Sequence, residues 1–191
     1  MKFQDSKLAH KYLDGLKGIE IGASAHNPFN LPNCVYISNN IDPNNIHHQE
    51  ELNLCGEIQR VNIVAEGNQL PLKNNSVDYV LSSHVIEHIY DVIGTLKEWW
   101  RVMKLGGYLF NVVPHKERTF DKDRNRTTVE ELIERRSGIR INNGPSDQHH
   151  SVWITLDFIE LCNYLNFPIV EILEIDDKVG NGFTIVCKKE Y

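Results

Sequence analysis

Two histidines and a glutamate lie within five positions of one another, immediately after a short apolar segment. His84 and His88 are four positions apart, and Glu87 follows His84 by three. If this segment is helical, these spacings place all three side chains on one face. Imidazole and carboxylate groups arranged in this way can bind a divalent cation, and a histidine can accept a proton near neutral pH. The alternative is structural, since a glutamate near a helix N-terminus is favoured by the helix dipole.

A strand and a helix must position these residues. The apolar run at residues 77–82 predicts a strand that ends just before His84, and residues 85–103 are predicted to form a helix with a break near Gly94. Further strands are predicted at residues 18–22, 35–42, 61–64, 108–113, 169–174 and 182–188. Helical spacing or capping signals occur at residues 6–16, 43–54, 128–133 and 155–166. This alternation indicates an α/β fold with a parallel sheet and right-handed crossovers.

The chain as a whole has the composition of a soluble globular protein. It has 191 residues, of which 41% are hydrophobic and 24% are charged, and its net charge is −6. The length suits one domain over residues 1–191, and the acidic balance disfavours binding to long nucleic acids. The sequence has no run of 18 apolar residues and no signal-peptide core at its N-terminus, so we expect no membrane partner. Four scattered cysteines favour the reducing cytoplasm.

A long polar segment, residues 115–150, follows the predicted fifth strand. It holds eight Lys or Arg and seven Asp or Glu residues, and it begins with His115. We expect it to lie beyond the carboxyl edge of the sheet as a lid, because loops of this length are often functional. Four of these basic residues lie soon after the fifth strand and either face solvent or clamp an anionic acceptor. They are Arg118, Lys122, Arg124 and Arg126.

Four short motifs occur in a characteristic order. They are Leu70-Pro71-Leu72, Val77-Asp78-Tyr79-Val80, Val85-Ile86-Glu87-His88 and Arg101-Val102-Met103-Lys104-Leu105-Gly106-Gly107. Over residues 17–114 this order resembles the class I S-adenosylmethionine (SAM)-dependent methyltransferases. The resemblance implies an enzyme that uses SAM as its cofactor. It also implies a Rossmann-like seven-stranded sheet that is mostly parallel, with an antiparallel last strand.

By this resemblance, the turn after the first strand would bind the cofactor. The turn reads Glu20-Ile21-Gly22-Ala23-Ser24-Ala25-His26, whereas family members usually have glycine at the positions of Ser24 and His26. Glu20, Gly22 and Ser24 are the implied cofactor-binding residues. Only residues 22–34 separate the first two strands, so we expect the usual crossover helix to be reduced.

Further cofactor contacts are implied at the ends of the next strands. Asp42 would accept hydrogen bonds from the ribose hydroxyls, because a carboxylate can accept two at once. Alternatively, it is a turn residue before Pro43. Glu66 and Gly67 would lie near the adenine, and Ser83 would close the cofactor site at the end of the fourth strand.

Some members of the family, such as the small-RNA 2′-O-methyltransferases and the ubiquinone-pathway O-methyltransferases, look similar around the histidines. They have Glu-x-x-Glu-His where this chain has His84, Glu87 and His88, and they bind a divalent metal. The RNA enzymes also have a histidine four residues before a Trp-Thr pair. Here His149 precedes Trp153 by four, but Ile154 is inserted before Thr155. The resemblance therefore adds His149 to the candidate metal ligands. We expect His149 to close over the helix that carries His84 and His88.

The leading functional hypothesis is O-methylation of a small molecule, such as a sugar, a glycan precursor or a similar metabolite. His84, His149 and His115 are the candidate catalytic residues, since a histidine can take the proton of an attacking hydroxyl. One alternative is a cofactor-binding relative without catalysis, because the glycine turn is altered. Another is a metal-dependent RNA 2′-O-methyltransferase, which the acidic charge opposes. The sequence does not determine the oligomeric state.

Overall fold

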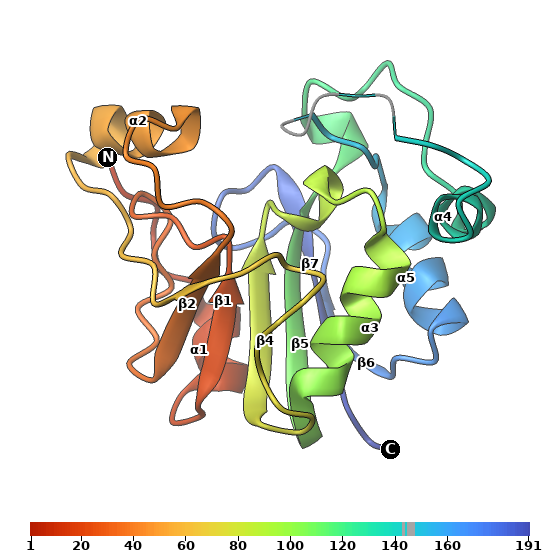
Figure 1. The fold of residues 1–191 in the computed structure, drawn as a ribbon, viewed down its shortest axis with the longest axis horizontal. Coiled ribbons are helices and arrows are strands. Elements are labelled where there is room, and N and C mark those ends of the chain that lie inside the picture. Colours follow the sequence, from red (N-terminus) through yellow and green to blue (C-terminus); the bar gives the residue numbers. More distant parts are fainter. Residues whose placement is uncertain (143, 145–147) are drawn as a thin grey trace.

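The computed structural model describes residues 1–142, 144 and 148–191. Its centre is one seven-stranded sheet with the order β3-β2-β1-β4-β5-β7-β6 (Figure 1). The strands are β1 (Gly18–Ile21), β2 (Cys34–Ser38), β3 (Ile63–Val64), β4 (Val77–Ser83), β5 (Met103–Pro114), β6 (Ile169–Leu173) and β7 (Gly182–Lys188). β1 to β5 pair in parallel, and β7 is antiparallel to both β5 and β6. The predicted α/β class and the antiparallel end of the sheet are confirmed.

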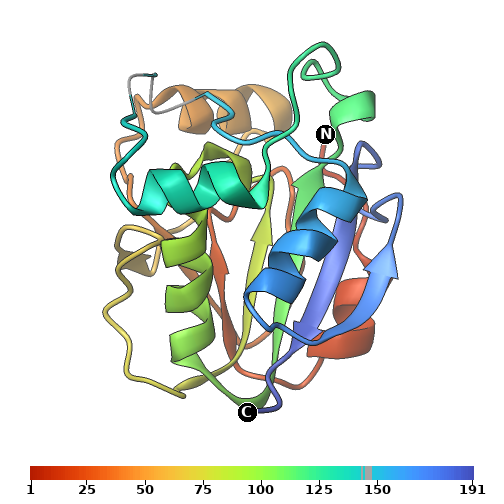
Figure 2. The same ribbon diagram turned by 90° about the vertical axis from the view of Figure 1, so that its right-hand side faces the viewer.

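Helices cover the two faces of the sheet unequally. The helices are α1 (Lys7–Leu13), α2 (Ile46–Cys55), η1 (Ile86–His88), α3 (Val92–Val102), η2 (Lys116–Arg118), α4 (Val129–Arg136) and α5 (Thr155–Tyr164). α3, α4 and α5 contribute to the larger apolar core on one face, as Figure 2 shows, while α1 contributes to the smaller core on the other. None of the helices in the described ranges is both long and apolar enough to cross a membrane.

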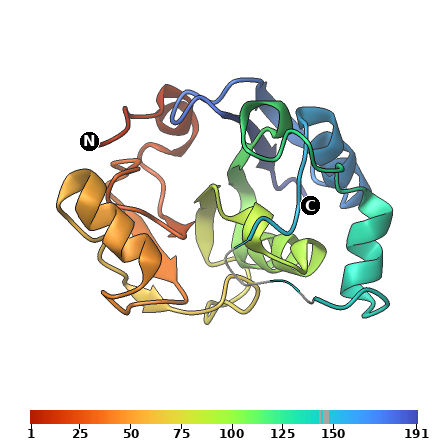
Figure 3. The same ribbon diagram turned by 90° about the horizontal axis from the view of Figure 1, so that it is seen from above.

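The carboxyl ends of the parallel strands form the upper edge of the sheet in Figure 1. Seen from above, α2 lies over one side of this edge and the polar segment after β5 lies over the other (Figure 3). No α-helix joins β1 to β2 within residues 22–33, all of which the structure describes. The predicted loss of the first crossover helix is therefore confirmed.

The predicted helix over residues 85–103 is wrong in its first half. The chain forms the single turn η1, then passes through an extended residue, Ile89, and only then begins α3. Asp91 starts α3 by accepting a hydrogen bond from the Gly94 backbone N–H at 2.9 Å. Gly94 therefore lies in the first turn of α3, and the break lies before it. The buried stripe of α3, with Leu96 and Trp99, then packs on the sheet.

The second strand is also shorter than predicted, because it ends at Ser38 and not near Asp42. Two asparagines follow it, and their side chains favour turns. The Asp42 backbone N–H donates to the Asn40 side chain at 2.7 Å, which bends the chain away from the sheet. The helix predicted from Pro43 begins three residues later, with Asn45 as its N-cap.

Candidate active site

Gly22 forms the turn at the end of β1, and its conformation explains why glycine is needed there. Its φ is +67°, a region that other residues rarely adopt. A Cβ added at this position would lie 2.6 Å from Cγ2 of Val85. The turn therefore brings exposed backbone close to the segment that follows β4.

In the loop after Gly22, some polar side chains are hydrogen-bonded within the protein, and one buried oxygen is not. Ser24 Oγ and His26 Nδ1, which replace the two expected glycines, are hydrogen-bonded to each other at 2.7 Å. Asn27 reaches across to β4, where its Nδ2 donates to Ser83 Oγ at 3.1 Å. Asn27 Oδ1 is buried and has no hydrogen-bond partner in the described part of the chain. Sequence reasoning missed Asn27, because its partner Ser83 is 56 positions away, at the end of the neighbouring strand β4.

Glu20 lies inside β1 and is almost fully buried, with 3% of its surface exposed. Burial raises the pKa of Glu20 to about 8, although the nearby Lys178 ammonium opposes that shift. Lys178 itself donates to the backbone oxygens of Gln4 and Pro28. Glu20 therefore lies below the edge of the sheet, within the core.

The residues predicted to bind the adenosine lie at the exposed side of the edge. Asp42 is four residues beyond β2, and its Oδ1 accepts a hydrogen bond from the Asn44 backbone N–H at 2.9 Å. Glu66 accepts weak hydrogen bonds from Asn39 Nδ2 at 3.3 and 3.4 Å. Asn39, not Asp42, directly follows β2. The Gly67 carbonyl accepts a hydrogen bond from Trp99 Nε1 at 2.8 Å, which fixes this turn to α3.

His84 directly follows β4 and does not lie on a helix, so the predicted common helical face of His84, Glu87 and His88 is wrong. Its φ is +54°, and its backbone N–H donates to the Val112 carbonyl at 3.0 Å. Nδ1 lies 3.8 Å from a Glu87 oxygen, while Nε2 is buried without a hydrogen-bond partner among the described residues. Burial lowers the pKa of His84, so the ring is neutral at pH 7.

Glu87, His88 and His149 come together over the end of β4. One ligand atom from each lies within 4.8 Å of the others. The rings of His88 and His149 meet edge to face, with their centroids 4.7 Å apart. The expected approach of His149 to this turn is therefore observed, although 61 positions separate it from His88.

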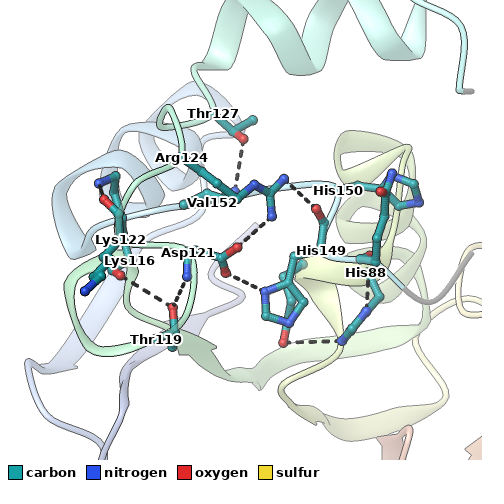
Figure 4. A network of polar contacts seen from close by, with 12 residues as sticks. His88, Lys116, Thr119, Asp121, Lys122, Arg124, Thr127, His149, His150 and Val152 are labelled. Atoms are coloured by element: carbon teal, nitrogen blue, oxygen red, sulfur yellow. Dashed lines mark hydrogen bonds and ion pairs between the residues drawn. The ribbon is translucent and has the colours of Figure 1, made fainter. Parts of the chain in front are cut away.

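Hydrogen bonds from two neighbouring segments hold His149 in place (Figure 4). His149 Nδ1 donates to Asp121 Oδ2 at 2.6 Å, and Arg124 bridges Asp121 Oδ1 at 2.6 Å and the His149 carbonyl at 2.8 Å. The backbone N–H groups of His150 and Ser151 donate to the Glu87 carbonyl. Asp121 is 2% exposed, and sequence reasoning missed it because it resembled one charge in a solvated run.

The remaining predicted residues of the polar segment have mainly structural contacts. His115 is buried and accepts a hydrogen bond from the Glu117 backbone N–H at 3.2 Å, and burial together with nearby Arg118 lowers the pKa of its ring. Arg118 donates to the Gly182 carbonyl at 2.6 Å. Arg126 lies 3.5 Å from Asp157. With Arg124 bound to Asp121, three of the four residues of the proposed anion clamp face partners within the chain.

A model of a family described as "Methyltransferase domain" matches residues 21–111, which include the ends of β1, β2, β3 and β4 and most of β5. This match indicates a methyltransferase domain in the central part of the chain. No curated protein matches the sequence significantly.

Solved structures share the fold of this methyltransferase at low sequence identity. A SAM-dependent methyltransferase from Aquifex aeolicus is 15% identical with a TM-score of 0.55, covering 92% of this chain and 83% of its own. A possible histamine N-methyltransferase from Thermotoga maritima is 18% identical with a TM-score of 0.59, covering 93% and 84%. The [4+2]-cyclase SpnF is 14% identical with a TM-score of 0.59, covering 95% and 79%. The likeness to a cyclase means that the fold by itself does not determine the reaction.

The ends of β1 and β4 have features that fit SAM, the cofactor that the resemblance implies. Gly22 keeps its backbone open at a point where a Cβ would collide with Val85. The unpartnered Asn27 Oδ1 offers an acceptor for the ammonium group of the cofactor, beside Ser83. Ser24 is bonded to His26, so the altered turn is ordered by its own side chains.

Proposed function

We propose that this methyltransferase transfers a methyl group from SAM to a hydroxyl group of a small molecule, of the sugar or glycan-precursor type. The observation that carries the proposal is His84, a neutral imidazole whose buried Nε2 has no hydrogen-bond partner in the described ranges. It follows β4 directly, beside Ser83 and the cofactor turn. A histidine placed there can accept the proton that a hydroxyl loses when it is methylated.

Bound SAM would supply an electrophilic methyl group on a positively charged sulfur. The acceptor oxygen would form the new O–CH3 bond as the S–CH3 bond breaks, and the hydroxyl proton would pass to His84 Nε2. Gly22, Asn27 and Ser83 would hold the cofactor and thereby fix the direction of attack. The polar segment with His149 would cover the acceptor side and exclude water.

The contacts of the basic residues favour an uncharged acceptor. Arg118 donates to the Gly182 carbonyl, and Arg124 is paired with Asp121. The buried atoms of Asn27 and Glu87 that have no partner among the described residues are oxygens, so they require hydrogen-bond donors or a cation. A polyhydroxylated molecule provides donors, whereas a phosphate group provides only acceptors. The net charge of −6 further opposes RNA as the acceptor.

An acceptor panel tests this proposal. The protein is first titrated with SAM and with its demethylated product in a calorimeter. It is then incubated with SAM and four groups of acceptors: neutral sugars, their phosphates, small amines and short RNA. Mass spectrometry detects the methylated product, and we expect turnover with neutral hydroxyl compounds. Methylation of amines or RNA alone would contradict the proposal, and tight SAM binding without turnover on any group would favour a non-catalytic role.

A further inference from the structure

The carboxylate of Glu87 is buried, and the described residues do not compensate its charge. Its side chain is 0% exposed, and neither carboxylate oxygen has a hydrogen-bond partner within residues 1–142, 144 and 148–191. An isolated buried carboxylate is strongly unfavourable unless it is paired, bound to a metal or protonated. Asp121 is a second buried carboxylate nearby, and its charge also acts to raise the pKa of Glu87.

The described arginines near Glu87 do not neutralise it. Arg124 is paired with Asp121 at 2.6 Å. Arg135 donates to Ser151 Oγ, to the His150 carbonyl and to Glu131. The imidazole nitrogens of His84 and His88 are each 3.8 Å from Glu87 Oε1, which is too long for a hydrogen bond.

The geometry around Glu87 is that of a metal site with three protein ligands. One atom each from Glu87, His88 and His149 lies within 4.8 Å of the other two. Zinc binds nitrogen and oxygen ligands at about 2.0–2.2 Å, so neighbouring ligand atoms of a tetrahedral site lie about 3.4 Å apart. A contraction of at most about 1.4 Å, within the range of side-chain adjustment, would therefore bring all three atoms onto one ion.

Asp121 gives His149 the orientation that a metal ligand needs. Because Nδ1 donates its proton to Asp121, Nε2 carries the free lone pair. Histidine ligands of metals usually donate their other N–H to a carboxylate or carbonyl in this manner. His88 Nδ1 also donates to a backbone carbonyl, that of Gln148, at 3.2 Å. Figure 4 shows His149 between Asp121 and His88.

We propose that Glu87, His88 and His149 bind one divalent transition-metal ion, with Asp121 as the residue that positions His149. Two imidazoles and one carboxylate suit Zn²⁺, Mn²⁺, Fe²⁺ or Co²⁺ better than Mg²⁺ or Ca²⁺, which prefer oxygen ligands. His84 does not belong to the set of three residues whose ligand atoms all lie within 4.8 Å of one another, so we keep it as the base. The role of the ion rests on the proposed function: its open positions would bind the acceptor hydroxyl and favour loss of its proton to His84.

Metal titration tests the site without an acceptor. Protein freed of metal by a chelator is titrated by calorimetry with Zn²⁺, Co²⁺, Mn²⁺ and Mg²⁺, and the Co²⁺ complex is examined by visible absorption. We expect one equivalent of Zn²⁺ or Co²⁺ to bind and Mg²⁺ to bind far more weakly. The Co²⁺ spectrum should show mixed nitrogen and oxygen ligands with four or five positions filled.

Variants separate this site from adventitious binding. Glu87→Gln and His149→Asn should abolish the one-equivalent binding, and Asp121→Asn should weaken it by about 10–100-fold. His47→Ala is the matched control, because His47 lies on α2 with 63% of its side chain exposed. Circular dichroism verifies folding, and Glu87→Gln should fold normally because it removes an uncompensated charge. Binding lost in the His47 variant, or unchanged in the Glu87 and His149 variants, would overturn the proposal.

The outcomes also distinguish the metal site from the proposed function. If one equivalent of metal binds through these residues but no hydroxyl compound is methylated, the site stands and the proposed acceptor class fails. If hydroxyl compounds are methylated at the same rate by chelated protein, and no metal binds, the proposed function stands and the metal site fails.

Discussion

Several polar side chains near the ends of β1 and β2 bind residues close to them in sequence, whereas key side chains near the ends of β4 and β5 bind distant residues or have no partner among the described residues. Asp42 caps a turn through Asn44, and Ser24 is bonded to His26. On the other side, His149 is bonded to Asp121, 28 positions away, and the atoms of His84 Nε2 and the Glu87 carboxylate are buried without described partners.

This difference suggests that the two sides of the sheet edge have different roles, one in binding the cofactor and the other in the reaction. Groups that are satisfied within their own turn need no ligand to be stable, so the side near β1 to β3 is already ordered for a cofactor. Buried groups without partners are unfavourable until something binds them. We therefore propose that the side near β4 and β5, with His84 and Glu87, carries the chemistry.

The largest expected effect is that variants on the two sides change different quantities, kcat on one side and SAM affinity on the other. His84→Ala should lower kcat by about 10²–10⁴-fold, the contribution of a general base, and leave SAM affinity nearly unchanged. Gly22→Ala should instead weaken SAM binding, because a Cβ at φ +67° would strain the turn and collide with Val85. Calorimetry with SAM and single-turnover kinetics measure the two quantities separately. If both variants lose SAM binding equally, the two sides are not independent.

The second prediction concerns stability and uses Glu20, which lies beneath the cofactor side. Its folded pKa of about 8 is above the ordinary value of 4.5, so its protonated form stabilises the fold at low pH. That stabilisation is complete below pH 4.5 and is lost as pH rises towards 8. Glu20→Gln should therefore match the wild type near pH 4.5 and be more stable at pH 9, by about 2–5 kcal/mol. Urea unfolding at pH 5, 7 and 9 measures this, and parallel pH profiles would contradict it.

The contrast between the two sides also explains which features could be predicted from the sequence. β7 was predicted at its observed bounds, because alternating apolar residues and the turn around Gly180 are local signals. Thr128 was predicted as the start of α4, and it accepts the expected hydrogen bond from the Glu131 backbone N–H. The break in the helix predicted over residues 85–103 was placed near Gly94 but lies before Asp91, whose N-cap hydrogen bond to Gly94 is a local signal.

The candidate site was predictable only in part, for the same reason. His84, Glu87 and His88 stood out because they are close in sequence, and the family resemblance added His149. Asp121 and Asn27 act through partners 28 and 56 positions away, His149 and Ser83. Such pairings depend on which strands become neighbours in the sheet, and no local pattern contains that information.

A third prediction tests whether Asp42 binds the cofactor or only shapes its turn. Asp42→Asn keeps an oxygen that can accept from the Asn44 backbone N–H, so stability should not change. If Asp42 also accepts the ribose hydroxyls, loss of its charge should weaken SAM binding by about 1–3 kcal/mol. Calorimetry with SAM measures this, with Asn39→Ala as a second variant at the residue that directly follows β2. Unchanged affinity in Asp42→Asn together with a loss in Asn39→Ala would transfer the ribose contact to Asn39.

The smallest effect is expected at Arg126, where the acceptor side meets solvent. Its side chain is 52% exposed and lies 3.5 Å from Asp157, so the ion pair is screened by water. Arg126→Ala should change the free energy of unfolding by less than about 1 kcal/mol. It should also leave the KM for a neutral acceptor unchanged, because the buried groups that demand a ligand are Glu87 and His84. Denaturant unfolding and steady-state kinetics measure the two effects, with Lys97→Ala, at an exposed cation on α3, as the control. A large rise in KM for a phosphorylated acceptor in Arg126→Ala, but not in Lys97→Ala, would restore the anion clamp and place acceptor recognition in the polar segment.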